Sequence, residues 1–256
     1  MWLGNWALAG VRFVLIAVVV FGLMVPMVLL RLLGFSQISQ GIVRLACQLT
    51  LRVIGLRVLT QGMPMTQPGG VVANHSTWLD IFVLNAVQRV LFVSKAEVAK
   101  WPLIGLIARS VGTVFIERKA SHAAKHRDTF QARLNDGYRL LFFPEGTSTD
   151  GRRVLGFKPT LFAAFFAPDA REIAYIQPVS VAYFAPENCD PRYYGWWGGA
   201  EFFSSFFNVL GRYRQGHVVV TFHPALAVKG VADRKVMAAQ TQAAVQSGLA
   251  DALKVG

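Results

Sequence analysis

The stretch GGVVANHSTWLD, residues 69–80, joins a short apolar run to a polar segment that carries a histidine and a carboxylate. The run that ends at Ala73 is short and β-branched, which predicts a buried strand. His75 follows where this strand would open onto a loop, and Asp80 stands at the start of the next apolar stretch. We therefore expect a strand, a loop and a helix in this order.

His75 and Asp80 allow two interpretations. Residues five apart on a regular helix point about 140° away from each other, so these side chains meet only if His75 lies in the loop and Asp80 in the first helical turn. The carboxylate would then orient the imidazole and leave one ring nitrogen as a base. The plainer interpretation is a helix start, because Thr77 and Asp80 have the spacing of a capping box. Taken alone, the pair favours the helix start.

Short β-rich runs alternate with helical stretches from residue 69 onward. The expected strands are residues 71–73, 90–93, 112–116, 139–143, 173–183 and 217–222. The expected helices are residues 78–87, 103–110, 120–135 and 160–167. This alternation predicts an α/β fold with a mostly parallel central sheet flanked by helices, in which active sites lie at the carboxyl ends of strands. The aromatic, glycine-rich segment 190–207 has no readable place in that sheet.

The N-terminal part has a different character. It holds no acidic residue before Asp80, and Phe13–Leu30 is an uninterrupted apolar run. As a helix this run would be about 27 Å long, close to the hydrocarbon thickness of a bilayer. Gly22 and Pro26 weaken or kink such a helix, so it either crosses the membrane or lies within one leaflet. A signal peptide is disfavoured by the length of the run and the lack of a small-residue cleavage site.

Residues 36–58 predict a second helix, because apolar residues recur at spacings of three and four. Its arginines, Arg44 and Arg52, would face water or lipid headgroups, and a helix that packs on the core explains the pattern equally well. We expect residues 1–59 to form a membrane-anchoring helix pair and residues 60–256 to form a single catalytic or binding domain.

The composition narrows the class of protein. Among 256 residues, 54% are hydrophobic, and 26 Lys+Arg against 14 Asp+Glu give a formal charge of +12. A basic, apolar chain indicates a membrane surface with anionic headgroups or an acidic soluble substrate. Nucleic acid is not expected as a partner, because the charges are spread out. The isolated Cys47 and Cys189 predict neither a disulfide framework nor a metal cluster, and fit a reducing, cytoplasm-facing setting.

Two other kinds of site are also disfavoured. His122 and His126 have the spacing of metal ligands on a helix, but their polar surroundings favour a solvated face, so we expect no metal. A serine hydrolase is disfavoured because the chain has no G-x-S-x-G motif.

Three further blocks also stand at the ends of predicted strands. GTVFIER, residues 112–118, ends on Arg118, and FFPEGTSTDG, residues 142–151, contains a turn whose N–H groups could bind an anion. IQPVSV, residues 176–181, is a strand interrupted by Pro178. Each block has an ordinary explanation as a charged strand end, a turn or a bulge. Their order along the chain is harder to explain in that way.

Together the four blocks resemble those of the PlsC-like glycerolipid acyltransferases, which include 1-acylglycerol-3-phosphate acyltransferase. NHSTWLD is similar to the NHx4D block, GTVFIER to G-x-x-F-I-x-R, FPEGT to F-P-E-G-T, and IQPVS to the final V-P-V-type block. The resemblance spans residues 74–181 and implies a glycerol-3-phosphate acyltransferase-like fold with a two-helix anchor. It also implies transfer of a fatty acyl group from acyl-CoA or acyl carrier protein to the hydroxyl of a lysolipid, without a cofactor, a metal or an acyl-enzyme.

The resemblance also assigns roles to residues. His75 becomes the base that deprotonates the hydroxyl, and Asp80 orients it; such proton removal accelerates a reaction by about 10²–10⁴-fold. Backbone N–H groups near residues 74–77 or 145–147 could bind the developing oxyanion. The implied acceptor-binding positions are Lys95, Gly112, Phe115, Arg118, Glu145, Gly146 and Thr147, with Arg118 as the phosphate contact.

The sequence offers two candidate acceptors for the acyl group. The leading acceptor is 1-acyl-sn-glycerol-3-phosphate, which would give phosphatidic acid. However, Ser148 stands where many of these enzymes carry a phosphate-binding arginine. The run FPEGTSTDGRRVLGFK is also similar to a bacterial subgroup of lyso-ornithine lipid acyltransferases, whose acceptor has no phosphate. Side chains that could replace the arginine are Arg152, Arg153 and Lys158.

A non-catalytic lipid-binding membrane protein is the alternative from a different class. The intact His75 and Asp80 argue against it. We expect an enzyme at the cytoplasmic face of the inner membrane, with membrane lipids as its surroundings.

Overall fold

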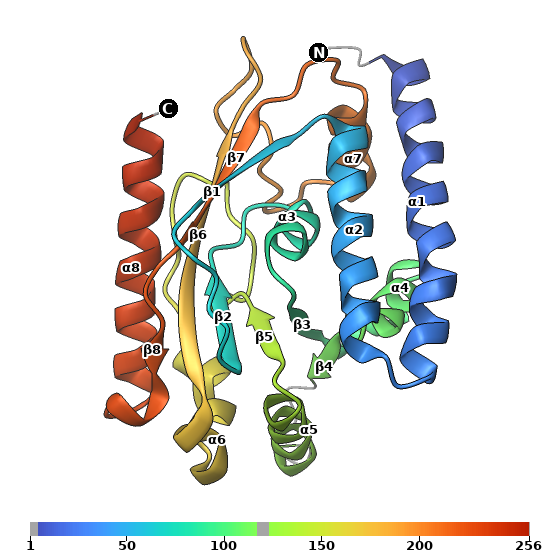
Figure 1. Ribbon diagram of the computed structural model, residues 1–256. Coiled ribbons are helices and arrows are strands. Elements are labelled where there is room, and N and C mark those ends of the chain that lie inside the picture. The colour runs from blue at the N-terminus through green and yellow to red at the C-terminus, as the bar shows by residue number, and fades with distance from the viewer. Residues whose placement is uncertain (1–4, 117–122, 256) are drawn as a thin grey trace.

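A central sheet with helices on both faces forms the body of the protein (Figure 1). The computed structural model describes residues 5–116 and 123–255. Within these ranges the strands are β1 Arg57–Gln61, β2 Gly69–Ala73, β3 Leu91–Lys95, β4 Val114–Ile116, β5 Arg139–Phe142, β6 Tyr175–Phe184, β7 His217–Phe222 and β8 Leu226–Ala227. They lie in the order β1-β7-β6-β2-β5-β3-β4, and β8 pairs with β6. The pairs of β6 with β7 and β8 are antiparallel and the others parallel, which confirms the predicted fold class.

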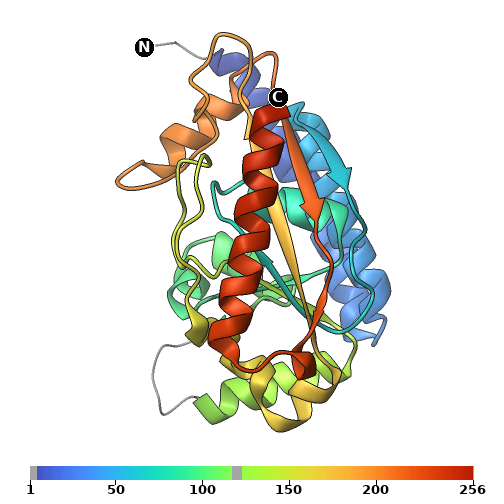
Figure 2. The same ribbon diagram turned by 90° about the vertical axis from the view of Figure 1, so that its left-hand side faces the viewer.

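The helices lie in two layers. They are α1 Trp6–Leu32, α2 Ser36–Ile54, α3 Asp80–Val87, α4 Ile104–Ser110, α5 Ala123–Asn135, α6 Pro168–Ile173, α7 Phe202–Leu210 and α8 Arg234–Val255. In Figures 1 and 2, α1, α2 and α3 cover one face of the sheet and α8 runs along the other. The predicted helix 160–167 is instead a 3₁₀ helix, Pro159–Phe166, which the extended residue Ala167 separates from α6. Segment 190–207 contains the start of α7.

Helix α1 contains the whole apolar run Phe13–Leu30, and Pro26 lies inside the helix without ending it. The helix is long and apolar enough to cross a membrane, and only 11% of its most apolar window is buried in the protein. It packs along α2, which in turn packs on α3. The apolar surface that α1 leaves exposed suits contact with lipid.

The second helix ends earlier than predicted. Gly55 follows Ile54 with φ of 87°, a left-handed conformation that ends α2. The expectation of a helix up to Val58 is wrong, because the chain from Arg57 onward forms β1 and pairs with β7. Strand β1 therefore crosses the predicted boundary between residues 59 and 60. The assignment of residues 1–59 to anchoring and 60–256 to catalysis stays a prediction about their roles.

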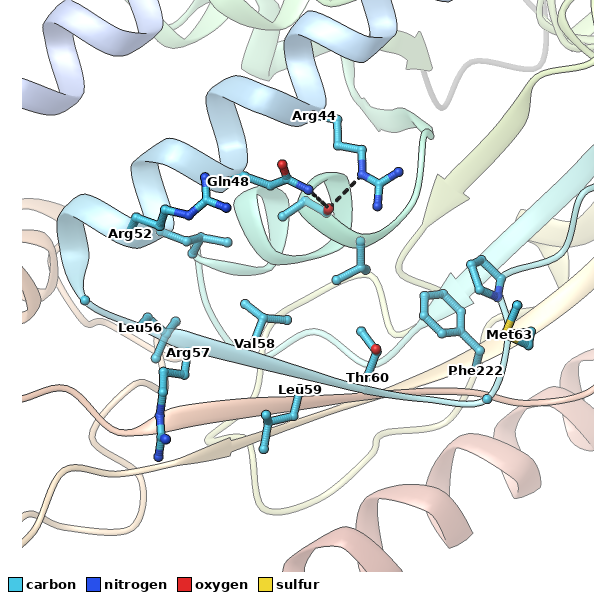
Figure 3. Close-up of a pocket in the computed structure, with 16 residues that line it drawn as sticks. Arg44, Gln48, Arg52, Leu56, Arg57, Val58, Leu59, Thr60, Met63 and Phe222 are labelled. Carbon is cyan, nitrogen blue, oxygen red and sulfur yellow. Dashed lines mark hydrogen bonds between the residues drawn. The ribbon is translucent and has the colours of Figure 1, made fainter.

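Strand β1 forms one edge of the sheet and leaves a groove between itself and α2 (Figure 3). The groove has a volume of about 790 Å³. Ala86 and Val87, in the last turn of α3, are among the residues that line it. The groove therefore lies at the end of α3 away from Asp80.

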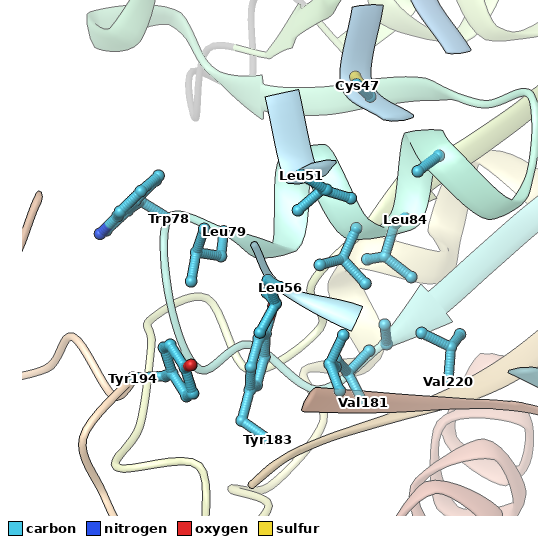
Figure 4. Packing of buried hydrophobic residues seen from close by; sticks show 14 of the residues in the cluster. Cys47, Leu51, Leu56, Trp78, Leu79, Leu84, Val181, Tyr183, Tyr194 and Val220 are labelled. Atoms are coloured by element: carbon cyan, nitrogen blue, oxygen red, sulfur yellow. The ribbon is translucent and has the colours of Figure 1, made fainter. Parts of the chain in front are cut away.

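The sheet separates two hydrophobic cores, because alternate residues of a strand point to opposite faces. In β2, Val71 and Ala73 face the core beneath α2 and α3, whereas Val72 faces the core beneath α8. Figure 4 shows the first core, where α2 and α3 pack against Val181 of β6 and Val220 of β7. Burying one such large apolar side chain contributes about 1.5–3 kcal/mol, so the strand end that carries His75 rests on a rigid base.

Pro178 lies inside β6 rather than at a sheet edge. The carbonyl of Pro178 accepts a bond from the His223 N–H, so this residue turns its backbone towards β7 and β8. β7 ends at Phe222 and β8 starts at Leu226, and Pro178 lies at the gap between them. The missing N–H of the proline therefore costs no strand-to-strand bond.

Candidate active site

His75 and Asp80 lie at the carboxyl end of β2 and are in direct contact. The Nδ1 atom of His75 is 2.7 Å from Oδ2 of Asp80. His75 lies in the loop and Asp80 is the first residue of α3, which is the only arrangement in which the predicted pair could meet. The two side chains therefore have the geometry of a histidine oriented by a carboxylate, and their catalytic roles stay a prediction.

The Asp80 carboxylate is fully buried and has four partners. Besides His75, its Oδ2 atom accepts bonds from the N–H groups of Ser76 at 2.8 Å and Thr77 at 3.1 Å. Its Oδ1 atom accepts a bond from the Tyr183 hydroxyl at 2.7 Å. These donors compensate for the loss of water around a buried charge. The carboxylate is thus held rigidly against the imidazole.

The helix start predicted as the plainer interpretation is present in part. Asp80 accepts from the Thr77 N–H, which is one half of a capping box. The Thr77 hydroxyl oxygen accepts instead from Leu79 N–H, at 3.5 Å. One carboxylate therefore both stabilises the start of α3 and contacts the histidine.

The His75 ring is placed for proton transfer. With Nδ1 donating to Asp80, the Nε2 atom carries the free lone pair. No described residue forms a hydrogen bond with Nε2, and the side chain is 19% exposed. The ring stacks on Phe143 with centroids 4.1 Å apart and planes 11° apart. Packing fixes the plane of the ring and leaves Nε2 open to a ligand.

The loop after β5 holds the backbone of His75 on both sides. Glu145 Oε1 accepts from the His75 N–H at 2.8 Å, and Glu145 Oε2 accepts from the Leu155 N–H at 2.7 Å. The His75 carbonyl accepts from the Thr149 N–H at 2.9 Å. Burial raises the pKa of the Glu145 carboxyl to about 7. Both of its oxygens are already bonded to backbone, so its acceptor-binding role stays a prediction.

Gly146 and its neighbours form a tight turn next to Glu145, which bonds the His75 backbone. Gly146 has φ of 73°, and a Cβ atom there would lie 2.7 Å from Nζ of Lys158. Thr147 is exposed. The Ser148 hydroxyl donates to the carbonyl of Trp196, so the side chain at the position of the missing arginine is bonded within the protein.

The other predicted residues that the structure describes lie on β3 and β4 or just before β4. Lys95 is exposed at the end of β3, which is two strands from β2 in the sheet order. Phe115 is half-buried in β4. Gly112 has φ of 86° and lies against Arg31 of α1, so that a Cβ would lie 2.8 Å from the guanidinium. Arg118 and His122 lie outside the described residues, and the side chain of His126 is not described.

An aromatic cluster joins the histidine loop to α1 and α7. Trp78 packs on Phe206 of α7 with ring centroids 5.1 Å apart. Phe206 and Phe207 in turn contact Phe13 of α1 at 6.3 and 6.1 Å. Apolar contacts therefore run from the histidine loop to the exposed apolar helix α1, which suits a substrate with an acyl chain.

Comparisons with known proteins identify the family of the chain. The sequence profile of the acyltransferase family matches residues 36–182, more than half of the chain. This chain belongs to the acyltransferase family. The structure of PlsC, a 1-acyl-sn-glycerophosphate acyltransferase from Thermotoga maritima, has the same fold, with a TM-score of 0.71 and 19% identity over 98% of this chain and 97% of that one. The predicted resemblance to PlsC-like acyltransferases is thus confirmed.

The acyltransferase is similar over most of its length to two lyso-ornithine lipid O-acyltransferases. It is 50% identical to the protein of Rhodobacter capsulatus over 84% of this chain and 78% of that protein. It is 34% identical to the protein of Brucella abortus over 80% of each chain. With the 1-acyl-sn-glycerol-3-phosphate acyltransferase of Neisseria meningitidis it shares 36% identity over 47% of this chain and 48% of that protein.

Two residues of the candidate site were not predicted from sequence. Tyr183 bonds Asp80, and the Trp196 N–H donates to the Ser76 carbonyl at 2.8 Å. Tyr183 falls on the same face of β6 as Val179 and Val181, so the alternation after IQPVS is a signal that could have found it. Within the described ranges, no group of three or more His, Cys, Asp and Glu side chains could hold a metal ion.

Proposed function

We propose that this acyltransferase moves a fatty acyl group from a thioester donor, acyl-CoA or acyl carrier protein, to the free hydroxyl of lyso-ornithine lipid. The 2.7 Å contact between His75 and Asp80 supports the chemistry. The acceptor hydroxyl gives its proton to Nε2 of His75 while its oxygen attacks the thioester carbonyl. Asp80 stabilises the imidazolium that forms.

Collapse of the tetrahedral intermediate breaks the carbon–sulfur bond, and the imidazolium returns its proton to the departing thiolate. The oxyanion needs N–H donors in the meantime. The N–H groups of His75, Ser76 and Thr77 are bonded to carboxylates, and that of Gly146 bonds the Phe143 carbonyl. Thr147 is exposed in the turn and its N–H has no described partner, so we assign the oxyanion to this part of the loop.

The choice of lyso-ornithine lipid rests on similarity and on Ser148. The similarity to the lyso-ornithine lipid enzymes extends over most of the chain, whereas that to the glycerophosphate enzyme covers less than half. The hydroxyl of Ser148 bonds Trp196, and a headgroup without phosphate needs no arginine there. The acceptor first expected, 1-acyl-sn-glycerol-3-phosphate, becomes the second candidate, supported by the glycerophosphate relative.

The apolar helix α1 and the membrane-lipid relatives support action at a membrane surface, which we assign to the cytoplasmic face of the inner membrane. Acceptor-binding roles for Lys95, Gly112, Phe115, Arg118, Glu145, Gly146 and Thr147 belong to the same proposal.

The deciding experiment offers both acceptors to the purified protein. Lyso-ornithine lipid and 1-acyl-sn-glycerol-3-phosphate are supplied in equal amounts, first with acyl-CoA and then with acyl carrier protein, and the products are measured by mass spectrometry. We expect ornithine lipid as the main product. Phosphatidic acid as the main product would overturn the acceptor, and turnover by the His75→Ala variant would overturn the base.

A further inference from the structure

The groove between α2 and β1 has a basic wall. Arg44, Gln48 and Arg52 lie four residues apart along α2 and line the groove (Figure 3). Because four residues make about one helical turn, they form a single row about 12 Å long. Arg44 Nε and Gln48 Nε2 each donate to the carbonyl of Ala86 at 3.0 Å, which fixes this part of the row.

Among the residues that the structure describes, no acidic side chain forms an ion pair with the arginines that line the groove. The chain contains no acidic residue before Asp80, and neither Arg44 nor Arg52 forms an ion pair with any residue in the described ranges. The terminal amino groups of Arg44 also have no partner among those residues. Guanidinium groups that are held in place and unpaired favour phosphate or carboxylate.

Apart from Arg57 and Thr60 of β1, the rest of the groove is mainly apolar. Leu51, Val58, Met63 and Phe222 contribute to its lining, with Val58 pointing from β1 towards α2 in Figure 3. Its volume of about 790 Å³ falls within the usual range of ligand sites, which runs from about 300 to 1,000 Å³. The combination of a basic row and an apolar floor matches a molecule that has an anionic headgroup and an acyl chain.

The groove lies apart from the proposed reaction site at His75. His75 and the loop after β5 lie at the start of α3, whereas the groove meets the end of that helix, about 12 Å further along. None of residues 74–80 or 143–149 lines it. It does adjoin α2, which packs on the exposed apolar helix α1, so a lipid of the same membrane could reach it.

We propose that this groove binds an anionic phospholipid of the surrounding membrane at a site distinct from the reacting acceptor. The phosphate lies along the row from Arg44 to Arg52, and part of an acyl chain lies on Leu51 and Val58. An extended peptide that adds to the free edge of β1 would bind main-chain groups and would need neither arginine. The charge of the row favours the lipid.

Binding is tested without turnover, on the full chain in detergent micelles. The thermal unfolding midpoint is followed as phosphatidylglycerol, phosphatidylcholine or inorganic phosphate is added. Phosphatidylglycerol is expected to raise the midpoint, and the other two are not. In the Arg52→Gln variant the half-saturating concentration of phosphatidylglycerol is expected to rise about tenfold or more, as expected for the loss of a charge-assisted bond.

Arg234→Gln with Lys235→Gln is the matched control, because it removes two exposed positive charges from α8 on the opposite face of the sheet. This variant should respond like the unaltered protein. Arg44→Gln with Arg52→Gln should lose the response altogether. An unchanged response in Arg52→Gln, an equal effect of phosphatidylcholine, or saturation by inorganic phosphate would each overturn the proposal. None of these results depends on the acceptor or on His75.

Discussion

The hydroxyl of Tyr183 lies 2.7 Å from Oδ1 of Asp80 and holds the oxygen that His75 does not use. Burial, followed by the charge of Asp80, raises the pKa of Tyr183 well above its ordinary value, so the hydroxyl stays protonated and donates. The tyrosine comes from β6 and the carboxylate from α3. The contact therefore fixes the carboxylate to the sheet on which the histidine loop also rests.

Tyr183→Phe is expected to lower kcat by about tenfold to a hundredfold, the effect of losing one hydrogen bond to a charged group. KM should change little, because Tyr183 acts through Asp80. Tyr193→Phe is the matched control: its hydroxyl donates to the Asn208 carbonyl, away from the carboxylate. Steady-state kinetics of both variants check this, and equal effects in the two would contradict a positioning role for Tyr183.

Asp80→Asn is expected to reduce kcat by about 10²-fold or more, because a neutral amide no longer stabilises the imidazolium that forms during the reaction. The Ser76 and Thr77 N–H groups can still donate to the amide oxygen, so the start of α3 should persist. Circular dichroism and kcat measured on the same sample separate the two effects. Activity within a few-fold of the unaltered protein would rule out Asp80 as the orienting group.

Local sequence indicated the geometry in which His75 and Asp80 can meet, because it needs only a strand end followed by a helix start. The choice of that geometry over a plain helix start came from the other three blocks. Tyr183 and Trp196 come from parts of the chain more than a hundred residues away. Their approach depends on β6 lying next to β2, which no short motif specifies. Ser148 could be identified as a departure from the family pattern, but only the fold shows that its partner is Trp196.

The elements that were not predicted from the sequence have a weak apolar periodicity. β1, with the sequence RVLTQ, is exposed at four of its five positions and becomes a strand through pairing with β7. α8 is rich in alanine and glutamine and shows no clear apolar stripe. The predicted helix up to Val58 extended a real periodicity past Gly55, where the left-handed backbone ends it. Tertiary contacts determine the secondary structure of these segments, because their local preference for helix or strand is weak.

Glu145 should make stability depend on pH. Burial raises its pKa from 4.5 to about 7 in the folded protein, so between these values the folded state binds more protons than the unfolded state. The free energy of unfolding should therefore fall as pH rises from about 4.5 to 7, by about 3 kcal/mol in total, and this residue should add no slope above that range.

Glu145→Gln should flatten this slope and also lose one of the bonds to the N–H groups of His75 and Leu155. Denaturant unfolding of both proteins in detergent at several pH values between 4.5 and 8 checks the prediction. The same slope in both proteins would assign the pH dependence to other groups.

The turn at Gly146 should not accept a side chain. Gly146→Ala places a Cβ at φ of 73° and against the end of Lys158, so we expect a loss of about 1 kcal/mol in stability and lower activity as the turn shifts. Gly156→Ala is the control, since no atom lies within 4 Å of its added Cβ and its φ is not positive. Thermal unfolding and turnover of both variants are compared. Equal behaviour would show that the turn tolerates a side chain.

Charges placed on α1 should weaken membrane association without unfolding the protein. Val14 and Val18 are 58% and 65% exposed, and a charge at the centre of a membrane-inserted helix costs about 2.5–3.5 kcal/mol. Val14→Asp with Val18→Asp should therefore reduce the fraction of protein that floats with phospholipid vesicles. Val236→Asp with Val255→Asp adds the same charge at exposed positions of α8 and should leave flotation unchanged. If both double variants float equally well, α1 is not the element that enters the bilayer.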